Sequence, residues 1–208
     1  MKANVYIDGF NLYYAIRSTP YKWLDLGKLC KALLSGEGHR VNRIRYFTAL
    51  LHARSDPGQA QRQQVYLRAL ETIPGLSIHY GTFLSNTVMM PLAQAQPGQP
   101  AFARVLRTAE KGSDVNLATH LLVDAYDRDF EVAAVLSNDS DLVEPIRMAR
   151  EKLGLGVGVL YPPTRTPSSE LGQVASFRRQ IRERVLRVSQ FPDTLADSQG
   201  VITKPTTW

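Results

Sequence analysis

The sequence predicts an α/β fold, in which helices cover both faces of a mostly parallel sheet. Short apolar segments of strand length alternate along the chain with segments of helical periodicity, a pattern typical of βαβ units. The 208 residues, 44% of them hydrophobic, are enough for one globular domain with a core of ordinary size. No internal repeat divides the chain further.

The predicted strands are short apolar or alternating runs bounded by turn residues. The first ends on the carboxylate of Asp8, where Gly9 lets the backbone turn. The fifth is a continuous apolar run, and the fourth is expected at an edge or in a hairpin. Strands are predicted over Asn4–Asp8, Arg43–Leu51, Leu76–Leu84, Ala101–Arg107, Glu131–Leu136 and Gly156–Tyr161.

The predicted helices have apolar residues at i, i+3, i+4 and i+7 and end at proline or glycine. The second of them has Asp25 as its expected N-cap. The last is rich in arginine and reads as a basic amphipathic helix. Helices are predicted over Asn11–Arg17, Asp25–Leu34, Gln59–Thr72, Gly112–Tyr126, Asp141–Leu153 and Ser169–Gln190.

Three segments are expected to be irregular. A turn is predicted at Asp56-Pro57-Gly58, and the Pro/Gln/Ala-rich stretch Ser85–Pro100 is predicted to be a surface loop. The tail Phe191–Trp208 is expected either to be disordered or to lie back on the domain. Residues 1–162 are therefore predicted as the domain, and residues 163–208 as a C-terminal basic helix and tail packed on it.

The net charge of +6 is unevenly distributed along the chain. The segment from Thr108 to Asp141 contains eight carboxylates and two cations, a local charge of −6. The rest of the chain contains 23 cations and 11 carboxylates, a charge of +12. A basic body with an acidic strip suits a metalloenzyme that binds a polyanion. An exposed acidic helix on a mildly basic protein is the alternative. Surface charge is expected for Asp124, Asp127, Asp129 and Glu131.

Several classes of protein are excluded by what the sequence lacks. It has no apolar run of the roughly 18 residues that a membrane span requires and no signal peptide, so we expect a cytoplasmic protein without membrane contact. A single cysteine, Cys30, excludes an intrachain disulfide and a cysteine-based zinc site. The glycines of Gly154–Gly158 lack the spacing of a dinucleotide fingerprint, and there is no Walker A motif.

Carboxylates are predicted to gather where strands end. Asp8 ends the first strand, Asp139 and Asp141 follow the fifth, and Asp114 lies in the first turn of the helix that begins at Gly112. Ligands of open parallel sheets bind at this edge, and clustered carboxylates require a cation to remain ionised. Mg²⁺ or Mn²⁺ prefers such oxygen ligands and can activate water. Taken singly, each aspartate is better explained by a structural role, such as a helix cap at Asp8 or Asp141, and only their joint placement favours a site.

Three motifs in order resemble the NYN family, which are PIN-like, metal-dependent ribonuclease domains that include the bacterial LabA-like proteins. The motifs are Asp8-Gly9-Phe10-Asn11, Lys111-Gly112-Ser113-Asp114-Val115 and Ser137-Asn138-Asp139-Ser140-Asp141. The resemblance covers about residues 3 to 162. It implies a three-layer PIN-like (Rossmann-like) fold and a metal-dependent endoribonuclease that hydrolyses RNA phosphodiester bonds.

The resemblance also implies roles for single residues. Asp8, Asp114, Asp139 and Asp141 are the implied catalytic residues and ligands of Mg²⁺ or Mn²⁺. Asn11, Lys111 and Ser137 are the implied contacts to substrate or to metal-bound water. The sequence departs from the family at His120, where many relatives have a further acidic residue.

Basic and aromatic residues are candidates for RNA contacts outside the carboxylates. Arg178 and Arg179, on the predicted basic helix, are expected to contact the RNA backbone, unless that helix only covers the sheet. Other arginines expected to extend this surface are Arg43, Arg45, Arg54, Arg62 and Arg68. Aromatic residues that could stack on an unpaired base, or else pack in the core, are Tyr13, Tyr14, Tyr21 and Trp23.

Two alternatives to a ribonuclease are considered. A catalytically weak RNA-binding or regulatory module with the same fold is suggested by His120. An aspartyl-phosphate phosphatase is disfavoured, because Phe10 stands where its second aspartate belongs and no lysine lies near Asp139 in the sequence. The sequence leaves the oligomeric state open, a homodimer included.

Overall fold

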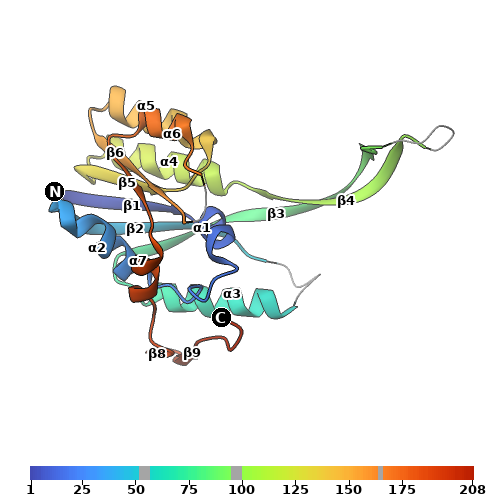
Figure 1. The fold of residues 1–208 in the computed structure, drawn as a ribbon, viewed down its shortest axis with the longest axis horizontal. Helices are drawn as coiled ribbons and strands as arrows, with labels where there is room; N and C mark the ends of the chain where they lie inside the picture. Colours follow the sequence, from blue (N-terminus) through green and yellow to red (C-terminus); the bar gives the residue numbers. More distant parts are fainter. Residues whose placement is uncertain (52–56, 95–99, 164–165) are drawn as a thin grey trace.

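The computed structural model describes residues 1–51, 57–94, 100–163 and 166–208. Its main sheet contains β1 (Lys2–Asp8), β2 (Arg40–Ala49), β3 (Leu76–Pro91), β4 (Phe102–Lys111), β5 (Val132–Leu136), β6 (Gly156–Tyr161) and β7 (Arg178–Gln180). The strand order is β4-β3-β2-β1-β5-β6-β7, and all of these strands except β7 are labelled in Figure 1. All neighbouring strands are parallel except β3 and β4, which are antiparallel.

Helices cover both faces of this sheet. They are α1 (Gly9–Ile16), α2 (Leu26–Leu34), α3 (Pro57–Glu71), α4 (Ser113–Tyr126), α5 (Val143–Glu151), α6 (Ser169–Val174) and α7 (Glu183–Val188), with 3-10 turns η1 (Ser35–Glu37) and η2 (Ser140–Leu142). One face carries α4, α5 and α6, and the other carries α2, α3 and α7 (Figure 1). The predicted three-layer, PIN-like α/β architecture is confirmed. None of the helices in the described residues has the length and apolar character needed to span a bilayer.

Two apolar cores hold the three layers together, one on each face of the sheet. Leu12, Leu26 and Leu70 belong to the core beneath α1, α2 and α3, and Leu117 and Ile146 belong to the core beneath α4 and α5. Their burial stabilises the fold, because each large apolar side chain removed from water contributes about 1.5–3 kcal/mol. Apolar residues of the helices, such as Leu26, Leu70 and Leu121, therefore attach them to the sheet.

The order in which the chain adds strands to the sheet reverses at β1. From β1 it adds β2 and β3 on one side, whereas β5, β6 and β7 are added on the other. Since β1 and β5 are parallel neighbours with Ile7 opposite Leu136, the residues that follow the two strands meet at one edge. This topological switch point is the usual ligand site of open α/β sheets.

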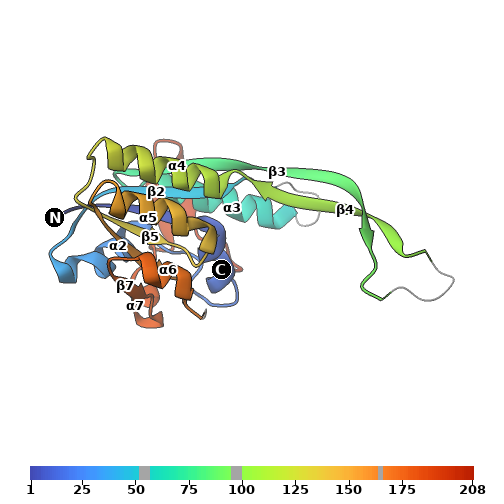
Figure 2. The same ribbon diagram turned by 90° about the horizontal axis from the view of Figure 1, so that it is seen from above.

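The strands β3 and β4 continue beyond the sheet as a two-stranded arm (Figure 2). The prediction of a surface loop over Ser85–Pro100 is wrong for residues 85–91, which extend β3, and residues 95–99 lie outside the described residues. Most side chains of this part of the arm are exposed, so its sequence lacks the alternation of a half-buried strand. Cross-strand pairing, such as Val88 opposite Val105, forms the arm instead.

The predicted basic helix over Ser169–Gln190 is also wrong. The segment forms α6, then β7, then α7, because residues 178–180 pair with the edge of β6. Phe177 packs against the backbone at Gly158, where a Cβ atom would lie only 2.1 Å from its ring. Sheet pairing and this ring contact interrupt the helical pattern.

The C-terminal tail lies back on the domain. It forms a small hairpin of β8 (Thr194–Asp197) and β9 (Gly200–Thr203), which Arg68 of α3 holds through Asp197, with 2.6 Å between Arg68 Nε and Asp197 Oδ2. Ile202 is buried in the core beneath α3. Of the predicted turn Asp56-Pro57-Gly58, Asp56 lies outside the described residues, and Pro57 and Gly58 begin α3.

Candidate active site

Asp8 lies at the carboxyl end of β1, with only 4% of its surface exposed. Its Oδ1 accepts a hydrogen bond from the Asn11 backbone nitrogen at 2.9 Å, which caps α1. Its Oδ2 accepts bonds from Asn11 Nδ2 and Ser137 Oγ, both at 2.8 Å. Asp8, Asn11 and Ser137 therefore form one rigid unit that joins the ends of β1 and β5.

The loop after β5 brings a second carboxylate to this edge. Ser137 is buried, and its Oγ also accepts a hydrogen bond from the Asp139 backbone nitrogen at 3.1 Å. Asp139 caps the 3-10 turn η2 by accepting from the Asp141 nitrogen at 3.0 Å. Asp141 itself is exposed, so Asp139 is the inner of the two aspartates.

The arm and α4 supply carboxylates from the opposite side. Glu110 lies at the base of the arm, near the end of β4. Its Oε1 accepts a hydrogen bond from the Ser113 backbone nitrogen at 3.0 Å, and its Oε2 accepts one from Ser113 Oγ at 2.8 Å. Asp114 follows in the first turn of α4. Gly81 leaves the space that Glu110 occupies, because a Cβ atom there would lie 2.2 Å from Glu110 Oε1.

A cavity of about 300 Å³ lies between these carboxylates. Its lining residues come from α1, the base of the arm, the start of α4 and the loop after β5. They are Asp8, Phe10, Asn11, Tyr14, Phe83, Thr108, Glu110, Ser113, Asp114 and Asp139.

The pKa values of two carboxyl groups in this cavity are raised, as expected where like charges lie close together. Partial burial, followed by the charges of Asp8, Asp139, Glu110 and Asp141, raises the pKa of Asp114 to about 6. Burial also raises the pKa of Asp8, and the charge of Asp139 adds to it, although the bonds from Asn11 and Ser137 oppose the shift. A cation bound here would reverse both shifts, because it favours the ionised carboxylates.

The donor chemistry of the cavity fits a hard divalent cation. In residues 1–51, 57–94, 100–163 and 166–208 no three His, Cys, Asp or Glu side chains are already arranged as a metal-binding group. Mg²⁺ needs fewer, since it commonly binds through one or two carboxylates and keeps several waters. The lone pairs that remain on Asp8 and the carboxylates of Asp114 and Asp139 are of the required type.

Three predicted substrate contacts do not reach this cavity. Lys111 neighbours Glu110 on β4, so its side chain points to the opposite face of the arm. Arg178 and Arg179 lie on β7 at the far edge of the sheet, where Arg179 donates to the Leu33 carbonyl of α2. Sequence reasoning placed the arginines on a helix that does not form.

Glu110 is the site residue that sequence reasoning missed. It belongs to the acidic strip between Thr108 and Asp141, but the predicted fourth strand ends at Arg107, so the sequence does not place Glu110 at the sheet edge. The signal that could have identified it is an acidic residue directly before a predicted helix, because such a carboxylate can accept from the first N–H groups of the helix, as Glu110 does from Ser113.

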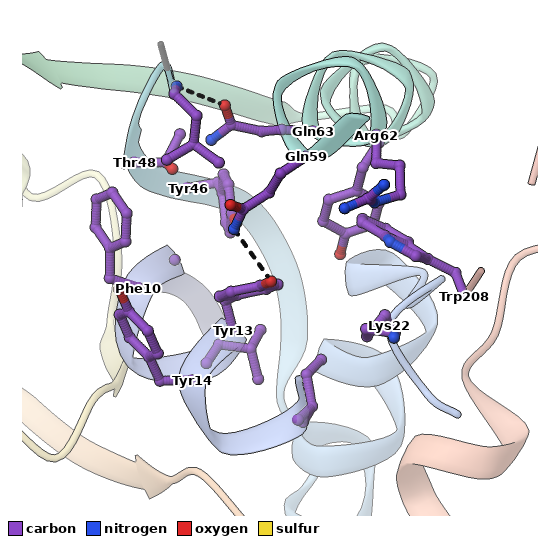
Figure 3. A pocket seen from close by; sticks show the side chains of 15 residues that line it. Phe10, Tyr13, Tyr14, Lys22, Tyr46, Thr48, Gln59, Arg62, Gln63 and Trp208 are labelled. Carbon is purple, nitrogen blue, oxygen red and sulfur yellow. Dashed lines mark hydrogen bonds between the residues drawn. The ribbon is translucent and has the colours of Figure 1, made fainter. Parts of the chain in front are cut away.

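The aromatic candidates divide between the core and the surface of α1. Trp23 is fully buried, and its Nε1 donates to the Pro192 carbonyl at 2.8 Å, so it cannot stack on a base. Tyr21 donates to Glu183 at 2.8 Å. Tyr13 and Tyr14 line a second cavity beside the first (Figure 3).

His120 does not face the carboxylate cavity. Its ring lies 4.1 Å from that of His79 and 5.8 Å from that of Phe47, measured between centroids, where α4 covers β2 and β3. Burial, followed by the charge of His120, lowers the pKa of His79 to about 4. The departure from the family pattern therefore belongs to a packing cluster.

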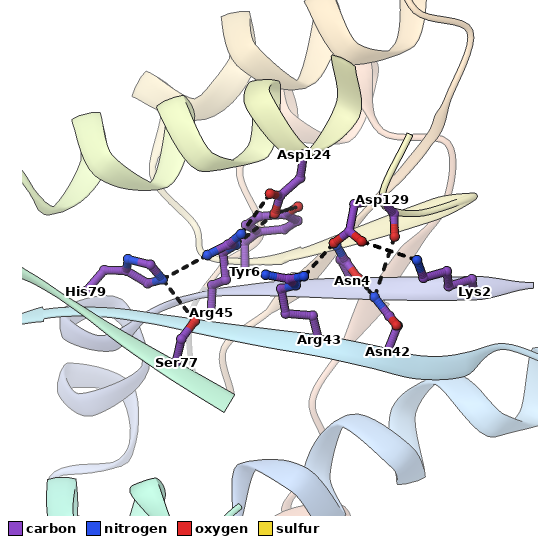
Figure 4. A network of polar contacts seen from close by, with 10 residues as sticks. All are labelled: Lys2, Asn4, Tyr6, Asn42, Arg43, Arg45, Ser77, His79, Asp124 and Asp129. Carbon is purple, nitrogen blue, oxygen red and sulfur yellow. Dashed lines mark hydrogen bonds and ion pairs between the residues drawn. The ribbon is translucent and has the colours of Figure 1, made fainter. Parts of the chain in front are cut away.

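Two carboxylates expected on the surface are structural (Figure 4). Asp124 is 5% exposed and accepts from Arg45 Nε, Arg45 Nη2 and Tyr6 Oη, each at 2.7 Å. Asp129 accepts from Asn4 Nδ2 at 2.9 Å and pairs with Arg43, with 3.1 Å between Nε and Oδ2.

Three of the arginines expected to extend an RNA surface form ion pairs within the protein instead. Arg43 and Arg45 belong to the Asp124 and Asp129 network, and Arg68 pairs with Asp197. Arg62 lines the second cavity, and Arg54 lies outside the described residues.

Comparisons with known proteins give a family match, a curated relative and a structural match. The family model described as the NYN domain matches residues 2–179. A curated relative, 6-hydroxy-3-succinoylpyridine 3-monooxygenase HspA from Pseudomonas putida (strain DSM 28022 / S16), is 27% identical over 236 aligned residues, which span 100% of this chain and 75% of that protein. A crystal structure of a protein of unknown function from Vibrio parahaemolyticus RIMD 2210633 superposes with a TM-score of 0.56 at 19% identity, covering 88% of this chain and 93% of the other. The structural match shows a shared fold.

Proposed function

Because the chain belongs to the NYN domain family, we propose that it is a metal-dependent endoribonuclease that hydrolyses RNA phosphodiester bonds. The observation that carries the proposal is the convergence of Asp8, Glu110, Asp114 and Asp139 around one cavity at the switch point of the sheet. The raised pKa of Asp114 supports it, since a site that holds excess negative charge is suited to a divalent cation.

In this proposal Asp8, Asp114 and Asp139 hold Mg²⁺ or Mn²⁺, with Asp141 at the exposed rim. When bound, such a cation activates water and stabilises the leaving oxygen of a phosphodiester. Asn11 and Ser137 keep the Asp8 carboxylate oriented through their hydrogen bonds. Glu110 holds the start of α4, and with it Asp114, through Ser113. Lys111, Arg178 and Arg179 remain proposed substrate contacts only for RNA that reaches beyond the cavity.

The proposal is tested with labelled single-stranded RNA and DNA incubated with Mn²⁺, Mg²⁺ or EDTA. We expect RNA cleavage with either metal, none with EDTA, and a loss of about 10²-fold or more in Asp8→Asn and Asp114→Asn, the usual scale for removing a catalytic electrostatic group. Asp127→Asn is the matched control, because Asp127 is an exposed carboxylate outside the cavity. Cleavage that persists in both site variants would identify a contaminating nuclease.

Binding of RNA without cleavage would favour the RNA-binding module. That alternative rested on His120, which the structure places against His79 and Phe47 rather than among the carboxylates.

The curated relative suggests a second candidate, oxygenation of a heteroaromatic acid. The observation that favours it is the aromatic lining of the cavity beside Tyr13 and Tyr14. Incubation with 6-hydroxy-3-succinoylpyridine, oxygen and a reduced nicotinamide cofactor tests it. Consumption of oxygen that depends on the pyridine would support this candidate over the ribonuclease.

A further inference from the structure

A second cavity of about 80 Å³ lies between α1, β2, α3 and the C-terminal residue Trp208 (Figure 3). A single water molecule needs roughly 10–15 Å³ by the same measure, so the cavity has room for one ring-sized group. The proposed catalytic role of the carboxylates makes no use of it.

Aromatic side chains form a large part of the wall, six of its fifteen lining residues. Tyr46 is buried at its back, and Tyr13, Tyr14 and Trp208 come from α1 and the chain end. Such rings present flat apolar faces, which favour stacking with another flat ring. The wall therefore selects for an aromatic ligand over a flexible aliphatic one.

Polar groups of defined type complete the cavity. Lys22 and Arg62 supply positive charge, and Gln59 and Gln63 supply side-chain amides. Gln59 Nε2 donates to Tyr13 Oη at 3.4 Å, at the long limit of a hydrogen bond. This combination fits a heteroaromatic ring with hydrogen-bonding edges and an adjacent anionic group.

The walls are held in place before any ligand arrives. Trp208 packs against Tyr66 and Trp23 at centroid distances of 5.5 and 6.3 Å. Gly9 allows Tyr46 to approach α1, because a Cβ atom there would lie 2.7 Å from the Tyr46 ring. A preformed site binds its ligand without a large ordering cost.

The cavity adjoins the carboxylate site. Phe10 and Tyr14 line both cavities, and α1, which carries them, begins directly after Asp8. A ring held here would be next to a phosphate held at the carboxylates.

We propose that this aromatic cavity binds the base of one substrate nucleotide, next to the phosphodiester at the carboxylates. The assignment of the ring to RNA rests on the proposed ribonuclease function. The shared chemistry, a flat heteroaromatic ring with an anionic substituent, also describes a free heteroaromatic acid, and the experiment separates the two sources.

Calorimetric titration of the full chain in EDTA tests the cavity without cleavage. The probes are UMP, AMP, ribose 5-phosphate and 6-hydroxynicotinate. We expect UMP or AMP to bind saturably and ribose 5-phosphate to bind at least about tenfold more weakly, because it lacks the ring.

Variants assign that binding to the cavity. We expect Tyr14→Leu and Trp208→Leu each to weaken nucleotide binding about tenfold, and Tyr14→Phe, which keeps the ring, to stay within about twofold of the wild type. Lys22→Ala should weaken the binding of UMP more than that of uridine, which is titrated as a further probe because it lacks the phosphate. Tyr126→Leu and Lys31→Ala are the matched controls, because both residues are exposed and lie away from the cavity. Neither variant should change nucleotide binding.

Three results would overturn the proposal: equal binding of ribose 5-phosphate and UMP, binding unaffected by the cavity variants, or binding of 6-hydroxynicotinate alone. The ribonuclease proposal is judged separately by metal-dependent cleavage. If RNA is not cleaved but UMP binds with this variant pattern, the cavity assignment stands and the ribonuclease fails. If RNA is cleaved while the variants alter neither binding nor KM, only the cavity assignment fails.

Discussion

At the scale of single residues, the sequence offered a helix cap and a metal ligand as alternative roles for Asp8, and the structure shows the cap. One carboxylate oxygen caps α1, and the other is held by Asn11 and Ser137. A carboxylate has about four lone-pair positions, so three accepted hydrogen bonds leave capacity for a cation. Capping and metal binding are therefore compatible, and the cap is what orients the carboxylate.

Asp114 provides a stability test of the charge cluster. Its folded pKa of about 6 lies above the unfolded value near 3.8, so ionisation is unfavourable in the folded state. The resulting loss of stability develops as the pH rises from about 4 to 6 and is complete above that range. We expect Asp114→Asn in EDTA to stabilise the protein at pH 7.5 by about 1 kcal/mol, after discounting for partial exposure, and to have almost no effect at pH 4.

Thermal unfolding at the two pH values measures this effect, which corresponds to a rise of about 2–4 °C in Tm for a chain of this size. Mn²⁺ should raise the Tm of the wild type more than that of Asp114→Asn. Asp127→Asn, outside the cavity, should show neither behaviour. A lower Tm for Asp114→Asn at pH 7.5 in EDTA would contradict the charge cluster.

At the scale of elements, the buried pair of Arg45 and Asp124 joins α4 to the sheet. Arg45 comes from β2, Tyr6 from β1, and both donate to the same carboxylate of α4. Hydrogen bonding through both carboxylate oxygens fixes the position of the helix. Since Asp114 begins the same helix, this pair also helps to position the candidate active site.

Removing one partner of this pair should therefore be costly. We expect Asp124→Ala to lower the free energy of unfolding by about 3–5 kcal/mol, because Arg45 would remain buried without its counter-charge. Denaturant unfolding measures the change. Asp127→Ala, three residues further along, should cost less than about 0.5 kcal/mol, and a similarly small effect for Asp124→Ala would show that the pair does not hold α4.

At the scale of the whole molecule, the arm of β3 and β4 has an exposed outer part and a base that belongs to the site. Phe83, Thr108 and Glu110 at its base line the carboxylate cavity. Further out, Met89 and Leu106 are 62% and 63% exposed, so this part buries little apolar surface. The stability of the body should therefore be independent of the outer arm.

Replacing residues 87–106 by Asn-Gly tests this independence. Asn86 and Arg107 are cross-strand partners, and a two-residue Asn-Gly turn suits such a pair. We expect a change in Tm of less than about 2 °C, with the circular dichroism of the body retained. Loss of cooperative unfolding would show that the outer arm supports the core.

The amino-acid sequence by itself determined the layered α/β fold and three of the carboxylates that line the cavity, Asp8 and Asp139 after strands and Asp114 at the start of a helix. Local signals are sufficient for these, because apolar periodicity records which face of an element is buried, and carboxyl ends of parallel strands share one edge. The Asp25 cap of α2 is another local signal, and the structure confirms it with a 2.9 Å bond to the Lys28 nitrogen.

Only the tertiary structure decided the arm, the break between α6 and α7, and the role of Asp124. Each depends on a partner distant in the sequence: β4 for the arm, the edge of β6 for residues 178–180, and Arg45 for Asp124. Glu110 entered the site for the same reason, since Gly81 on the neighbouring strand leaves room for its carboxylate. Contacts of this kind leave no periodic trace in the sequence, because one long-range pairing can override the local preference of a short segment.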